Sequence, residues 1–204
     1  MRNAVVAFAA GVMLAAAVLG LYLPAIEMCV GAALIFVPLG TAAGILFLRA
    51  VTWASGKIGN GTLKARPELL FVLALALHKL PEGMAGGVGW IGTDLTAART
   101  VVIGIAIQNL PEGAVMIPPM LAAGVSRRRA ACIALATGAL NAAGVFAGAL
   151  WGSLFANVLP FALAFAGGAM LDVIVTNMIP QTLRENASIV TGGFVLMMCL
   201  NAVF

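Results

Sequence analysis

Charged residues are scarce in this sequence. Only 9% of its 204 residues are Asp, Glu, Lys or Arg, while 63% are hydrophobic, and the mean hydropathy is +1.11. A soluble domain carries roughly 25% charged residues because its surface must face water. The composition therefore excludes a soluble globular protein and indicates a chain embedded in a lipid bilayer.

Cysteine and histidine are also rare. The three cysteines, Cys29, Cys132 and Cys199, show no Cys-x-x-Cys spacing, and His78 is the only histidine. This pattern predicts neither a disulfide framework nor a thiolate metal site. We expect the three thiols to be small packing residues in or beside apolar helices.

What the sequence has instead is long, continuous apolar runs rich in Ala, Leu, Val and Gly. A membrane-spanning helix needs about 20 mostly apolar residues, whereas barrel strands alternate polar and apolar positions over about ten residues. We predict an all-α integral membrane protein whose residues 1–204 form a single transmembrane domain. About seven transmembrane helices are expected, at 4–24, 29–50, 68–88, 99–123, 130–152, 157–179 and 187–204.

The basic residues indicate an orientation rather than a nucleic-acid partner, although the net charge is +4. Nearly all of them fall around alternate predicted loops on one side of the bilayer, and the positive-inside rule makes that side cytoplasmic. Seven spans then place the N-terminus inside and the C-terminus outside. The residues concerned are Arg49, Lys57, Lys64, Arg66, Arg127, Arg128, Arg129 and Arg184.

Away from the predicted loops, few ionisable residues remain, and each costs a few kcal/mol in the bilayer unless it is paired, hydrated or metal-bound. These residues are His78, Lys79, Glu82, Glu112 and Asp172. The first four belong to two related segments, 77–83 (Leu-His-Lys-Leu-Pro-Glu-Gly) and 107–113 (Ile-Gln-Asn-Leu-Pro-Glu-Gly), which lie in consecutive and therefore antiparallel helices. For Asp172 two interpretations stay open: it lines an exit route, or it pairs with a neighbouring helix.

The spacing within the two segments indicates a metal site. His78 and Glu82 are four residues apart, so they share one helix face. Gln108 and Glu112 have the same spacing in the second segment. An imidazole with carboxylate and amide oxygens suits zinc and other first-row divalent ions. With one nitrogen and no thiolate, such a site binds its ion weakly enough to exchange it, as a carrier requires.

Pro81 and Pro111 occupy matching positions in the two segments. Proline cannot donate a hydrogen bond to the carbonyl group four residues earlier. Broken backbone at membrane depth is tolerated where it lines a cavity or a pathway. We therefore predict two kinked helices whose matching acids line a pathway.

A structural interpretation of the same residues stays open. His78, Lys79, Glu82 and Glu112 would then form a buried ion-pair network that pins two helices together. Lys79 has two interpretations of its own. It precedes Glu82 by three residues, so its ammonium group can sit beside either carboxylate and replace a second bound cation. Alternatively, its side chain snorkels away from the site.

These motifs resemble those of the ZIP (Zrt/Irt-like) family of divalent-metal transporters, nearest its bacterial GufA-like branch. In that family a His-Asn-x-Pro-Glu-Gly motif on the fourth helix faces a related motif on the fifth, and residues 78–83 and 108–113 resemble these two. The likeness covers essentially the whole chain: residues 7–16 resemble the second helix and residues 178–180 resemble part of the seventh. It implies a ZIP-like bundle. The family normally has eight helices, and the seven predicted here correspond to the second to the eighth, without a counterpart of the first.

The resemblance also implies roles for individual residues. The primary metal site would consist of His78, Glu82, Gln108 and Glu112. Met13 matches a methionine that approaches this site from the second helix of the family. The alternative interpretation of Met13 is that it only fills the core.

The departures from the family concern a second, adjacent metal ion. Lys79 and Asn109 match positions that often bind this ion, but lysine replaces the usual asparagine. Asn141 stands where many relatives have a bridging glutamate, and Thr176 and Asn177 stand where an acid is usual. These differences imply one metal ion per pathway.

The implied function is inward transport of divalent metal ions across a bacterial cytoplasmic membrane, zinc first, with iron, manganese or cadmium as other candidates. This is transport rather than catalysis, so we expect no enzyme activity, no cofactor and no nucleic-acid partner. The expected partners are the metal ion, the lipid bilayer and, from the resemblance alone, a second copy in a homodimer. Two rival functions stay open: a transport-inactive metal-binding or structural membrane protein, and a monovalent-cation or proton carrier that uses Glu82 and Glu112.

Overall fold

The computed structural model consists of helices and short turns, with no strand in the part of the chain that it describes. The described residues are 2–29, 31, 33–58, 67–88, 109, 112–114, 116–118, 120–155 and 157–203. The prediction of an all-α protein is confirmed for these residues.

The N-terminal helical run contains a π-helical segment. α1 (Arg2–Ala16), η1 (Ala17–Tyr22) and α2 (Leu23–Met28) follow one another without a break. Pro24 is the second residue of α2, a position where its missing N–H costs little. The run therefore continues past residue 24, where the sequence predicts its end.

α3 (Ala33–Ile58) and α4 (Pro67–Val88) follow. α3 extends well beyond the predicted span 29–50, so Lys57 lies inside a helix and not in a loop, and Arg49 lies well before the helix end. Long basic side chains can reach from the last turns of a helix toward the bilayer surface. The apolar run therefore ends before the helix does.

The C-terminal half contains two long kinked helices. Its elements are α6 (Arg127–Phe155), α7 (Leu159–Val173), η2 (Ile174–Met178) and α8 (Ile179–Val203). The backbone at Trp151 and at Asn186 is not helical, so α6 bends near its end and α8 bends near its start. α6 begins at Arg127, and the three arginines predicted to fill a loop form its first turn instead.

Four described stretches are long and apolar enough to cross a membrane: Ala4–Met28, Ile35–Ala54, Arg127–Gly152 and Leu159–Thr176. A shorter apolar helix, Asn186–Ala202, follows the bend in α8. Most of the predicted span 99–123 lies outside the described residues. The chain is thus a multi-pass membrane protein, while the count of seven spans stays a prediction.

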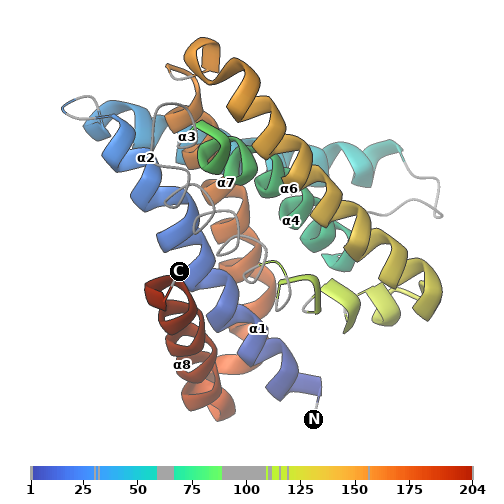
Figure 1. The fold of residues 1–204 in the computed structure, drawn as a ribbon. Coiled ribbons are helices and arrows are strands. Elements are labelled where there is room, and N and C mark those ends of the chain that lie inside the picture. Colours follow the sequence, from blue (N-terminus) through green and yellow to red (C-terminus); the bar gives the residue numbers. More distant parts are fainter. Residues whose placement is uncertain are drawn as a thin grey trace.

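The helices pack in pairs (Figure 1). α4 lies along α6, α1 along α8, and α3 along α7. α7 also contacts α4, η1 and α2, so it joins the pair α4 and α6 to the N-terminal helices. α7 is accordingly the most deeply buried of the long helices, with Leu163, Ala166 and Met170 fully inaccessible.

Large apolar side chains cover the outside of the bundle. Leu135, Phe146 and Leu154 on α6 are each at least 70% exposed. Extended apolar surfaces of this kind mark contact with a membrane. The core, by contrast, consists largely of alanine and methionine, which allows close helix packing.

Two glycines bring α4 and α6 into backbone contact. A Cβ atom on Gly83 would overlap the backbone carbonyl of Asn141, and one on Gly144 would overlap the backbone carbonyl of Leu80. Small residues permit this close approach between helices in lipid. The turn of α4 that follows Glu82 therefore rests directly on the turn of α6 that carries Asn141.

The cysteines do not serve as packing residues in the way that the sequence suggests. All three are free thiols, Cys29 is half-buried, and Cys132 and Cys199 are exposed on α6 and α8. A thiol behaves as a small hydrophobe, and a lipid-facing surface tolerates it as well as a core does. The expected position in or beside apolar helices is confirmed for these two residues, but they do not pack against the core.

Candidate metal centre

A buried lysine lies at the centre of the candidate site. Lys79, on α4, is only 1% exposed. Its Nζ atom contacts Oε2 of Glu112 and Oδ1 of Asn109, and it lies 3.6 Å from Oε2 of Glu82. The two Leu-Pro-Glu-Gly segments therefore meet through this side chain, which is turned toward the acids and not away from them.

Asn141 adds a third helix to the site. Its Nδ2 atom donates a hydrogen bond to Oε2 of Glu82 at 3.0 Å, and the residue is 1% exposed. The Asn141 side chain can contact Glu82 because the absence of a side chain at Gly83 brings the Asn141 backbone against α4. We refer to Lys79, Glu82, Asn109, Glu112 and Asn141 as the Lys79 cluster.

The Lys79 cluster carries a net negative charge. With both acids ionised and Lys79 protonated, the charges sum to −1, and both acids are buried, Glu82 at 5% and Glu112 at 0% exposure. Charges at this depth require partners because a low-dielectric interior penalises an isolated ion by several kcal/mol. An excess of one negative charge in such a setting favours a bound cation.

Only half of the predicted primary metal site can be placed. Glu82 and Glu112 come together, whereas Gln108 and the side chain of His78 lie outside the described residues. Among the described side chains, no group of three His, Cys, Asp or Glu residues comes close enough to hold a metal ion. Lys79 occupies the space between Asn109 and the two acids, where the family resemblance places a second ion.

Pro81 lies inside α4, one residue before Glu82. The helix continues without interruption to Val88, so the described backbone does not show the predicted break. Pro111 lies outside the described residues. Kinked helices at the site therefore stay a prediction.

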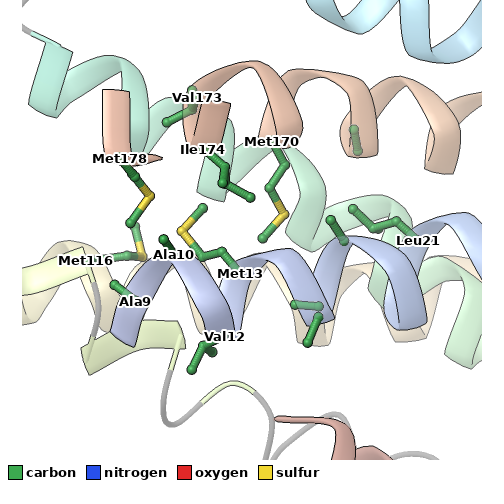
Figure 2. Close-up of a cluster of buried hydrophobic side chains, with 14 of the residues drawn as sticks. Ala9, Ala10, Val12, Met13, Leu21, Met116, Met170, Val173, Ile174 and Met178 are labelled. Carbon is green, nitrogen blue, oxygen red and sulfur yellow. The ribbon is translucent and has the colours of Figure 1, made fainter. Parts of the chain in front are cut away.

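Met13 lies in a cluster of sulfur atoms. Figure 2 shows the thioether groups of Met13, Met116 and Met178 turned toward one another, while Met170 lies further along α7. Met13 and Met116 are fully buried and Met178 is 5% exposed. Sequence reasoning missed Met116 and Met178. One signal was available for Met116, which follows Glu112 by four residues and so shares its helix face.

Asp172 pairs with a neighbouring helix, which was one of its two interpretations. Nε and Nη2 of Arg49 on α3 both donate to Oδ1 of Asp172, at 3.1 and 2.9 Å. Arg49 is largely exposed, whereas the Asp172 side chain is 9% exposed. The pair joins α3 to the end of α7, next to η2.

Thr176 uses its hydroxyl group locally. The hydroxyl donates to the backbone carbonyl of Asp172, one turn earlier, and the residue is exposed. The side chain of Asn177 lies outside the described residues. The described part of this turn therefore contributes no acid to the Lys79 cluster.

Comparison with known proteins identifies the family of the chain. Residues 56–201 match the family model described as ZIP zinc transporter. The chain is 39% identical over 201 residues to zinc transporter GufA of Myxococcus xanthus, covering 89% of this chain and 78% of that protein. It is 34% identical over 228 residues to zinc transporter ZIPB of Bordetella bronchiseptica, covering 98% and 71%.

A human relative has a similar sequence identity, but the match covers a smaller part of each chain. Zinc transporter ZIP11 of Homo sapiens is 42% identical over 146 residues, which cover 65% of this chain and 42% of that protein. Members of this family are transporters rather than enzymes, they carry no cofactor, and their substrate is zinc or another divalent metal. The chain therefore belongs to the ZIP family of metal-ion transporters, on its GufA-like bacterial branch.

Proposed function

We propose that this protein carries zinc inward across a bacterial cytoplasmic membrane, one ion per pathway. The ion would bind to His78, Glu82, Gln108 and Glu112. The observation that carries this proposal is the position of Lys79, which brings the acids of both Leu-Pro-Glu-Gly segments to one buried point. The printed names of the relatives, which are zinc transporters, support the choice of ion.

Each ligand has a distinct role in this mechanism. The carboxylates of Glu82 and Glu112 supply the charge that draws a hydrated cation from an outer cavity and strips its water. The imidazole of His78 favours zinc over magnesium or calcium, which prefer oxygen ligands. Protonation of the ligands weakens their grip on the ion, and helix rearrangement then releases it on the inner side. Iron, manganese and cadmium are further candidate substrates.

Lys79 acts in this mechanism as a permanent second cation. Its ammonium group sits where a second metal ion would otherwise bridge Asn109 and the acids. A second divalent ion at that place would meet direct repulsion. The same ammonium group keeps Glu112 paired when the transported ion has left, which avoids an isolated buried charge.

The proposal includes the topology that the sequence predicts. Seven spans place the N-terminus and the Arg127 end of α6 in the cytoplasm and the C-terminus outside. The homodimer is implied by the family resemblance, and chemical crosslinking of the purified protein tests it.

Zinc flux into proteoliposomes tests the transport site. We expect His78→Ala and Glu82→Gln each to lower zinc uptake about tenfold or more, because each removes one ligand or one charge from a small ligand set. Thr191→Ala is the control, since Thr191 is exposed on α8 and only donates to the carbonyl of Ala187. Undiminished uptake in both site variants would exclude the assignment of the site.

A transport-inactive protein of the same fold is the second candidate. The ion pairs of Lys79 with Glu82 and Glu112 favour it, because they would also pin α4 to the next segment without any transported ion. This candidate predicts that zinc raises the melting temperature of the purified protein while proteoliposomes show no zinc uptake. A monovalent-cation or proton carrier would instead show sodium or proton flux that zinc does not compete with.

A further inference from the structure

We propose that Met13, Met116 and Met178 form a second station on the ion pathway, a thioether cluster that selects soft divalent cations of the cadmium type. The inference rests on the proposed transport function and goes beyond it. Met13 is already a candidate at the primary metal site, whereas Met116 and Met178 are new residues on the pathway. Thioether sulfur is a soft ligand and prefers soft cations to hard ones such as manganese.

The three sulfur atoms come from three separate parts of the chain. Met13 lies on α1, Met178 ends η2, and Met116 follows the second Leu-Pro-Glu-Gly segment. α1 packs against η2, and the thioether groups point toward one another in Figure 2. All three residues are buried, so the sulfur atoms face the protein interior and not the lipid.

A strip of polar contacts connects the thioether cluster to the Lys79 cluster. On α6, Asn141 donates to Glu82, and Thr137 lies one turn earlier on the same helix face. The Thr137 hydroxyl donates to the Ala134 carbonyl oxygen at 2.7 Å and lies 3.5 Å from Sδ of Met116.

The segment that carries Glu112 and Met116 has the same four-residue spacing as Thr137 and Asn141 on α6. Glu112 and Met116 are four residues apart, which corresponds to about 6 Å along a helix. An ion that leaves the acids toward the Arg127 end of α6 therefore meets the sulfur of Met116 next. Under the predicted topology that end faces the cytoplasm, so the thioether cluster lies on the exit side.

Core filling is the alternative interpretation of these three residues, because methionine is frequent throughout the core. Leucine has nearly the volume of methionine and fills a core as well, yet three elements each present sulfur here. Thr137 also keeps a polar group against Met116 in an otherwise apolar core, which an ordinary packing role does not need. Met178 lies at the end of a π-helical segment, a feature that is frequent at functional sites.

Direct binding tests the thioether cluster without any transport measurement. The three cysteines are replaced by alanine so that thiolates do not contribute, and the purified full-length protein is loaded with cadmium alone. X-ray absorption at the cadmium edge should show sulfur neighbours that disappear in the double variant Met116→Leu/Met178→Leu. Met197→Leu, which removes an equally buried methionine from α8, should leave them in place. A sulfur shell that is absent from the parent, or unchanged in the double variant, would overturn the inference.

Competition in proteoliposomes then tests selectivity. We expect the double variant to weaken the inhibition of its remaining zinc uptake by cadmium about threefold to tenfold, relative to inhibition by manganese. Equal losses for all three metals would indicate a packing role and count against the proposal. If the parent protein shows cadmium–sulfur binding but no zinc uptake, the proposed transport function fails while the thioether site stands.

Discussion

At the scale of single residues, Lys79 determines how the two Leu-Pro-Glu-Gly segments meet. Its ammonium group is shared by Glu112, Glu82 and Asn109, and it is almost fully buried. Arginine could not replace it easily, since a planar guanidinium group is larger and presents a fixed fork of donors. The position therefore requires a compact charge on a flexible stem.

Replacing Lys79 by the asparagine that the family resemblance favours tests both of its roles. We expect Lys79→Asn to lower the free energy of unfolding of the metal-free protein by about 3–5 kcal/mol, because two buried carboxylates lose their counter-charge. Equilibrium dialysis should show the zinc content rise from one ion to two per chain.

The matched comparison for that prediction is Arg49→Gln. This change also removes a cation from an ion pair with an acid, but Arg49 is largely exposed. A loss of about 1 kcal/mol or less is expected there. Equal stabilities of the two variants, together with an unchanged zinc content for Lys79→Asn, would contradict the assigned role.

The sequence predicted that the acids of the two segments lie close together, but not which other residues contact them. The matching acids at Glu82 and Glu112 follow directly from the repeated motif and the cost of charge in lipid. The bond from Asn141 to Glu82 and the convergence of Met116 and Met178 could not be predicted. They depend on how each helix is rotated about its axis and on which helices are neighbours, and a single sequence specifies neither.

At the scale of elements, the contact between α4 and α6 sets the geometry of the site. We expect Gly83→Ala to reduce both thermal stability and zinc uptake, because its new Cβ atom meets the backbone of Asn141 and not a flexible side chain. The overlap would push α4 from α6 and lengthen the bond from Asn141 to Glu82.

Gly138→Ala on α6 is the matched control. A Cβ atom there meets nothing within 4 Å, and alanine is favoured over glycine in a helix by about 1 kcal/mol. This variant should be as stable as the parent or more so. A Gly83→Ala protein that melts and transports like Gly138→Ala would show that the close contact is unimportant.

Helix existence was easier to predict than helix ends. Hydropathy marks where the bilayer core stops, whereas a helix stops where its backbone hydrogen bonds do. Arg49 and Arg127 therefore fall inside α3 and α6 although both were predicted in or around loops. The bends at Trp151 and Asn186 lie at the ends of the predicted spans 130–152 and 187–204, so the apolar pattern marked these positions although the helices continue through them.

At the scale of the whole molecule, the predicted orientation can be measured directly. In a cysteine-free background, Ser126→Cys and Asn157→Cys place single exposed thiols just before and just after α6. A membrane-impermeant maleimide should label Asn157→Cys in intact cells and Ser126→Cys only in inside-out vesicles, because the arginines at the start of α6 favour the cytoplasm. The reverse pattern would invert the topology.

The charge balance of the Lys79 cluster has a consequence for the energetics of a transport cycle. With a neutral His78, the described cluster is −1 when empty, and a bound zinc ion brings it to +1. A membrane potential that is negative inside contributes about 2.3 kcal/mol per elementary charge per 100 mV. In the proposed inward transport, this voltage would draw the loaded site inward and drive the empty site outward, so it would assist both halves of the cycle. Without the lysine, the loaded site would be neutral and would gain nothing from the voltage on its inward passage.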